Sequence, residues 1–79
     1  GYSMLGEVIF NFKKYKYRME DKNKLLLYNP RNSGIFLVSG VTCQKLWNII
    51  ASNGFVQVDT DDKYISYFLK KEILMRRDA

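Results

Sequence analysis

The sequence predicts an α+β fold, in which a three-stranded antiparallel meander precedes either two or three helices. Three observations support this prediction. Apolar residues alternate with a period of two in the first half of the chain, a turn-rich segment separates two apolar runs, and the period becomes helical after residue 40. With 79 residues, the chain is expected to form one domain, 1–79, with a single modest core.

The first strand of the meander is expected at 14–19. Its aromatic and apolar residues occupy odd positions, and its outer face is basic, with Lys14, Lys16 and Arg18 on even positions. Upstream, the apolar residues of 8–12 also alternate, but on even positions. Such a change of parity requires a bulge, a bend or a break. The expectation is therefore either one long kinked strand or an extra N-terminal strand.

The next two strands are short and flank a clear loop. Leu25–Tyr28 forms the second strand of the meander, and Asn29–Gly34 is dense in residues that favour turns. Ile35–Val38 follows as a third strand that is apolar on both faces. Tight connections between three such strands indicate antiparallel pairing.

The first helix is expected after residue 40 and before Asn53-Gly54, which is a good C-terminal stop. Its apolar stripe is formed by Cys43, Leu46, Trp47, Ile49 and Ile50. Phe55–Val58 is an apolar link that is too short to assign.

The second helix is expected to open at Asp59–Asp62, where acidic and capping side chains meet the positive end of the helix dipole. Its inner face consists of Tyr64, Ile65, Phe68 and Leu69. Ile73–Met75 either extends this helix or folds back as a small strand.

The charge and composition limit the classes of partner and compartment. The net charge is +5, and basic residues gather at 13–24 and 70–77. Such clusters favour binding to nucleic acid, acidic peptides or anionic surfaces. The alternative is that they form a solvated face without a partner. The single cysteine, Cys43, indicates a reducing, cytoplasmic setting. No apolar run approaches the roughly 20 residues that span a bilayer, so no membrane association is expected. Residues 1–3 precede Met4 and are interpreted either as native or as a cloning remnant.

The residue types needed for catalysis are scarce. The chain has no histidine and one cysteine, which removes the commonest general base and any cysteine–histidine zinc site. Asp59, Asp61 and Asp62 lack the glycine and distal glutamate of a calcium loop, so helix capping is favoured. The sequence therefore predicts a binding protein that is not an enzyme and needs no metal or cofactor.

The order of these segments resembles the PqqD-like family, the RiPP recognition elements that bind leader peptides of ribosomally made, modified natural products. The matching segments are Lys24–Pro30, Gly34–Val38, Thr42, Leu46–Ile50, Asp61–Leu69 and Ile73-Leu74. The resemblance implies a winged-helix-like arrangement. It also implies that the domain holds a precursor's leader peptide for a separate modification enzyme, often a radical SAM enzyme in this family.

In that family, the leader adds as an antiparallel strand beside the third strand and lies against the last helix. The peptide-binding residues that the resemblance implies are Ile35, Phe36, Leu37, Val38, Tyr64, Tyr67, Phe68 and Lys71. The basic face of 14–18 is a hypothesis for the surface that meets the enzyme. The alternative is a small basic nucleic-acid-binding domain of winged-helix-like fold, and a third hypothesis is an interaction subunit for another protein.

Overall fold

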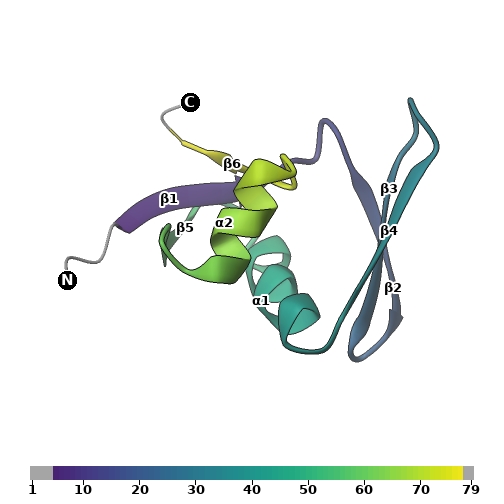
Figure 1. The fold of residues 1–79 in the computed structure, drawn as a ribbon, viewed down its shortest axis with the longest axis horizontal. Helices are drawn as coiled ribbons and strands as arrows, with labels where there is room; N and C mark the ends of the chain where they lie inside the picture. The colour runs from purple at the N-terminus through teal and green to yellow at the C-terminus, as the bar shows by residue number, and fades with distance from the viewer. Residues whose placement is uncertain (1–4, 78–79) are drawn as a thin grey trace.

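The structure is a computed structural model that describes residues 5–77, and it contains two three-stranded antiparallel sheets and two helices within that range. The first sheet, sheet A, has the strand order β5-β1-β6, and the second, sheet B, has the order β2-β3-β4. The two sheets lie at opposite ends of the molecule, with α1 and α2 between them (Figure 1). Residues 1–3, interpreted above as native or as a cloning remnant, lie outside the described residues.

Sheet B is the predicted meander. It consists of β2 (Lys16–Asp21), β3 (Lys24–Asn29) and β4 (Gly34–Ser39), and each strand pairs antiparallel with the next. One face is buried, through Leu25 and Leu27 on β3 and other core residues. The predicted meander and the α+β class are therefore confirmed.

The first strand of the meander begins later than expected, because residues 11–15 form a turn. Asn11 organises that turn: its side-chain oxygen accepts from the amide of Lys14 at 3.2 Å, and its carbonyl accepts from the amide of Tyr15 at 3.0 Å. Tyr15 is buried from within this turn, and its hydroxyl donates to the carbonyl of Lys71 at 3.2 Å. The turn also ends the upstream alternation, so Phe12 is exposed.

The N-terminal segment is a separate strand, β1 (Leu5–Phe10), and not the start of a long kinked one. It occupies the centre of sheet A, with β5 (Val56–Asp59) on one side and β6 (Leu74–Arg76) on the other. The short apolar link at 55–58 thus contributes a strand, and 73–75 folds back instead of extending the helix. Val8 and Phe10 point from β1 into the core, which joins both sheets to the helices.

Helix α1 (Gly40–Ala51) buries the predicted stripe through Cys43, Leu46, Ile49 and Ile50, while Trp47 is half-buried. Its first residue, Gly40, has φ +64°, a left-handed conformation that costs other residues about 1–2 kcal/mol. After the helix, Asn53 takes the left-handed conformation with φ 60°. The stop signal therefore acts through the asparagine and not through Gly54.

Helix α2 (Lys63–Lys70) begins at a capping aspartate, as expected. The side chain of Asp62 accepts from the amides of Tyr64 at 3.1 Å and Ile65 at 3.2 Å. Burial raises the pKa of the Asp62 carboxyl, but the hydrogen bonds from the Ile65 amide, the Lys45 ammonium and the Tyr64 amide outweigh it. The pKa of Asp62 therefore lies below its usual value of 3.8.

Replacing Asp62 by alanine should lower the free energy of unfolding by about 1 kcal/mol at pH 7, because two amides at the start of α2 lose their acceptor. A carboxyl whose pKa is lower in the folded state stabilises the fold above its unfolded pKa, and this contribution is lost as the pH falls through the folded pKa. The difference in the free energy of unfolding between Asp62→Ala and the parent should therefore shrink below about pH 4. Urea unfolding at several pH values measures it.

Asp61→Ala is the matched control for this prediction. Asp61 has the same charge, precedes the cap by one residue and is exposed, and its carboxylate makes no hydrogen bond or ion pair with residues 5–77. A loss of stability at Asp61→Ala equal to that at Asp62→Ala would contradict the capping role.

Neither helix within residues 5–77 is long and apolar enough to cross a membrane.

Candidate functional site

Strand β4 forms one edge of sheet B, and its outer side has no partner strand among residues 5–77. The amide of Gly40 donates to the carbonyl of Asn23 at 3.0 Å, which continues the β3–β4 register from the pair Lys24↔Ser39. In an antiparallel pair, hydrogen-bonded and non-hydrogen-bonded positions alternate. Counting back from Gly40, the even residues of β4 bond to β3. The backbone groups of Ile35, Leu37 and Ser39 therefore point to the open edge.

The side chains of β4 alternate between two faces that differ in exposure. Ile35 and Leu37 are 67% and 61% exposed, so they lie on the solvent face of sheet B. Phe36 is half-buried and Val38 is buried on the opposite face, where the ring of Phe36 meets that of Tyr15 edge-on at 6.0 Å. The strand thus combines an open backbone edge with an apolar inner row.

A groove of about 210 Å³ lies between β4 and the α2–β6 region. The residues that line it come from β4, the first turn of α1, α2 and the residue before β6. They are Phe36, Leu37, Val38, Ser39, Thr42, Tyr67 and Ile73. This lining contains no charged side chain, so the groove suits apolar groups.

The structure brings some of the sequence-predicted site residues together and separates others. Phe36, Leu37, Val38 and Tyr67 line the groove, and Tyr67 is 45% exposed. Ile35 lies beside them on the edge strand but faces solvent.

The other three predicted residues on or after α2 do not line the groove. Phe68 is 0% exposed and belongs to the core, although its ring meets that of its neighbour Tyr67 edge-on at 6.0 Å. Tyr64 lies against two lysine ammonium groups, of Lys45 and Lys63, each 5.3 Å from its ring centre. Lys71 is the C-cap of α2, and its backbone carbonyl accepts a hydrogen bond from the hydroxyl of Tyr15.

Three residues of the groove were not among the predicted site residues: Ser39, Thr42 and Ile73. Ser39 directly follows the expected third strand, so extending that strand by one residue would have included it, whereas Thr42 lies three residues further on, in the first turn of α1. Ile73 contributes because residues 72–73 turn back after α2, with its amide donating to the carbonyl of Phe68 at 2.8 Å. Only the fold-back alternative for 73–75 would have placed it here.

The basic face predicted for 14–18 is only partly present. Lys16 and Arg18 lie on the solvent face of sheet B, in register with Tyr28 and Leu26, and beyond these with Ile35 and Leu37. Lys14 instead lies in the turn before β2 and forms an ion pair with Glu72, which raises the pKa of Lys14. The solvent face of sheet B is therefore apolar in the middle and basic along β2.

No group of three or more histidine, cysteine, aspartate or glutamate side chains within residues 5–77 could hold a metal ion. The thiol of Cys43 is buried, and desolvation raises its pKa, which disfavours the thiolate that acts as a nucleophile.

No family model matches the chain, and no curated protein or solved structure matches it either.

Proposed function

We propose that this domain binds an extended peptide as a fourth strand of sheet B, beside β4, and does no chemistry of its own. The observation that carries the proposal is the coincidence of two features along one strand. The backbone of Ile35, Leu37 and Ser39 faces an open edge, and an uncharged groove lies directly beneath the same strand. An incoming strand satisfies open-edge amides and carbonyls, while pockets for alternate side chains select the sequence.

The register of β4 predicts which peptide side chains would be recognised. Peptide residues opposite Phe36 and Val38 would point toward the groove, where apolar side chains would contact Tyr67. Peptide residues opposite Ile35 and Leu37 would lie on the solvent face. We therefore expect a ligand with apolar residues at two alternate positions.

The ligand that this mode and the resemblance favour together is the leader of a ribosomally made precursor peptide. In the proposal, the domain is a cytoplasmic, winged-helix-like module that presents the precursor to a separate modification enzyme, a radical SAM enzyme being one candidate. Holding the leader raises the effective concentration of the rest of the precursor at the enzyme's active site. The solvent face of sheet B, apolar with Lys16 and Arg18 along β2, is the surface proposed for the enzyme.

The alternative of nucleic-acid binding has less support. Tyr15 is buried and its hydroxyl is bonded to the backbone, and the ring of Tyr17 packs 5.9 Å from those of Phe10 and Trp47. Tyr15 is therefore no platform for stacking bases, and Tyr17, which is 38% exposed, lies on the opposite face of β2 from Lys16 and Arg18.

The test is a titration of the purified domain with the leader of a precursor peptide encoded beside it, by calorimetry and by ¹⁵N NMR. We expect a dissociation constant at or below the low micromolar range that changes little with moderate salt, and amide shifts at 35–39 and Tyr67. Absence of leader binding, together with salt-sensitive binding of an oligonucleotide, would overturn the proposal in favour of the nucleic-acid alternative.

A further inference from the structure

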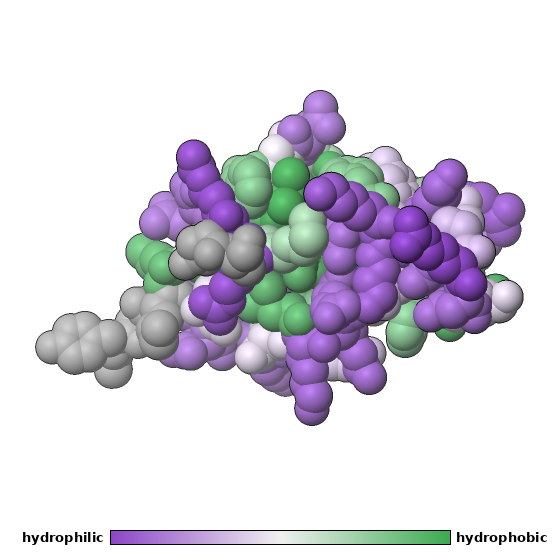
Figure 2. Space-filling model, turned by 90° about the horizontal axis from the view of Figure 1, so that it is seen from above, coloured by the Kyte–Doolittle hydropathy of each residue, from purple (hydrophilic) through white to green (hydrophobic). Residues whose placement is uncertain are grey.

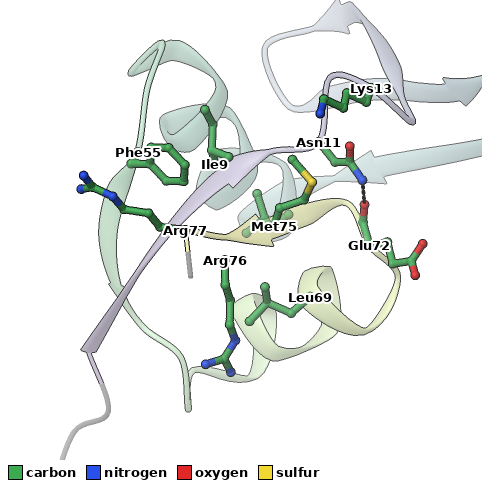
Figure 3. A pocket seen from close by; sticks show the side chains of 10 residues that line it. Ile9, Asn11, Lys13, Phe55, Leu69, Glu72, Met75, Arg76 and Arg77 are labelled. Atoms are coloured by element: carbon green, nitrogen blue, oxygen red, sulfur yellow. Dashed lines mark hydrogen bonds between the residues drawn. The ribbon is translucent and has the colours of Figure 1, made fainter. Parts of the chain in front are cut away.

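A second and larger groove, of about 690 Å³, surrounds β6 in sheet A, away from the β4 edge (Figure 3). This volume falls within the roughly 300–1,000 Å³ typical of binding sites. Sheet A lies outside the part of the fold used for the proposed leader site. The groove is thus a separate feature of the molecule.

The floor of the groove is apolar and only partly covered. Ile9 and Met75 are register partners on β1 and β6, and both are half-buried; Phe55 and Leu69 also line the groove. Phe55 is among the exposed large hydrophobic residues. Figure 2 shows a band of hydrophobic residues on the upper face of the molecule, with hydrophilic residues on either side of it.

Three cationic side chains line the same groove: Lys13, Arg76 and Arg77. Arg77 is neutralised, because its guanidinium donates to Glu7 at 2.6 Å, and it also lies 5.5 Å from the ring centre of Phe55. Lys13 and Arg76 are exposed and form no ion pair with residues 5–77. Figure 3 shows these two on different sides of Met75, with Lys13 on the turn after β1 and Arg76 beside α2.

The remaining acidic residue of the lining does not cancel this charge. Glu72 is held by Lys14 in an ion pair, which lowers the pKa of its carboxyl and keeps it ionised. The backbone carbonyl of Glu72 also accepts from the side chain of Asn11 at 2.9 Å, which fixes the turn after α2 against the turn after β1 (Figure 3). The turn that carries Lys13 is therefore held in place by a hydrogen bond to the turn after α2.

We propose that this groove binds an acidic, amphipathic peptide segment of a partner protein, at a site separate from the β4 edge. Arg76 is the register partner of the buried Val8, so it leaves β6 on the opposite face from Ile9 and Met75, while Lys13 lies on the turn after β1. Two cations that are separated by an edge strand match a segment with several carboxylates that are spaced by apolar side chains. A single-headed amphiphile would meet only one of them. An oligonucleotide would find the ring of Phe55 already occupied by Arg77, so the floor provides no aromatic platform for bases.

The experiment uses an acetylated seven-residue peptide in which glutamate alternates with valine, titrated into the ¹⁵N-labelled domain. The proposal predicts binding with amide shifts at Ile9, Phe55, Met75 and Arg76, and no binding of the counterpart with lysine for glutamate. Shifts confined to Ile35–Ser39 would overturn it. So would tighter binding of laurate or of a single-stranded oligonucleotide at the same amides, which would make the site one for lipid or nucleic acid.

Charge-reversal variants separate the site from general attraction to a basic protein. Lys13→Glu and Arg76→Glu should each weaken binding of the glutamate peptide about tenfold or more. Arg31→Glu, in the loop between β3 and β4, makes the same change in net charge and should alter the affinity less than twofold. Equal losses in all three variants would overturn the proposal. The leader titration reads out different amides, so failure of either proposal leaves the other open to its own test.

Discussion

Replacing Phe68 by alanine is expected to leave the domain largely unfolded at 25 °C. Phe68 is 0% exposed and belongs to the core cluster between the helices and the two sheets. Truncation of a buried phenylalanine costs about 3–5 kcal/mol. The core of a domain of this size rarely supplies more than about 3–5 kcal/mol of net stability. Circular dichroism and urea unfolding followed by Trp47 fluorescence provide the measurement.

Tyr67→Ala is the matched control, because it removes an aromatic ring from the adjacent position of the same helix. Tyr67 is 45% exposed, so its loss should cost less than about 1 kcal/mol. In the proposed function it should also weaken leader binding, since Tyr67 lines the groove below β4. A cost for Phe68→Ala no larger than that for Tyr67→Ala would contradict the described core.

Leu37→Pro is expected to weaken leader binding at least tenfold while the domain stays folded. The register of β4 directs the Leu37 amide to the open edge, so proline removes a donor to the incoming strand and places its ring in that strand's path. The bonds that even residues of β4 make to β3 are kept, and proline is tolerated on edge strands. Calorimetry with the leader measures the affinity, and thermal unfolding checks the fold.

Leu37→Thr isolates the contribution of the backbone, because threonine keeps the amide and suits a strand. We expect it to bind the leader within about threefold of the parent. If Leu37→Pro remained folded and bound the leader as tightly as Leu37→Thr, addition of the peptide to β4 would be wrong.

The elements that the sequence predicted are those whose residue pattern lies within a short stretch of consecutive residues. The meander depends on alternation and one turn-rich loop, and the two helices depend on apolar periodicity with capping residues such as Asp62. The helical period placed Ile65 and Phe68 inward, and both are buried.

Sheet A could not be assembled from the sequence, because two of its three strands are short and its pairings are distant in sequence. β5 has four residues and β6 has three, and β1 pairs with both through contacts such as Val8↔Val56 and Val8↔Arg76. Segments of three or four residues carry too little periodicity to be assigned as strands. The large groove around β6 was missed for the same reason.

The predicted site was incomplete for a different reason. Ile35–Val38 is apolar throughout, so the sequence alone does not determine which alternate residues face the core. The register with β3 decides it: Phe36 and Val38 face inward, while Ile35 and Leu37 face solvent. On α2, the helical period already placed Phe68 on the inner face, and it is buried; the resemblance alone grouped it with Tyr67, which lines the groove.

The position of β1 at the centre of sheet A has a consequence for synthesis on the ribosome. β1 emerges first, yet one of its two neighbours, β6, is formed by residues 74–76 near the end of the chain. Until those residues leave the exit tunnel, the apolar side chains of Val8 and Phe10 lack part of the surface that covers them. Sheet B and α1, whose contacts are nearer in sequence, can form earlier. We therefore expect sheet A to be completed last, when β6 pairs with β1.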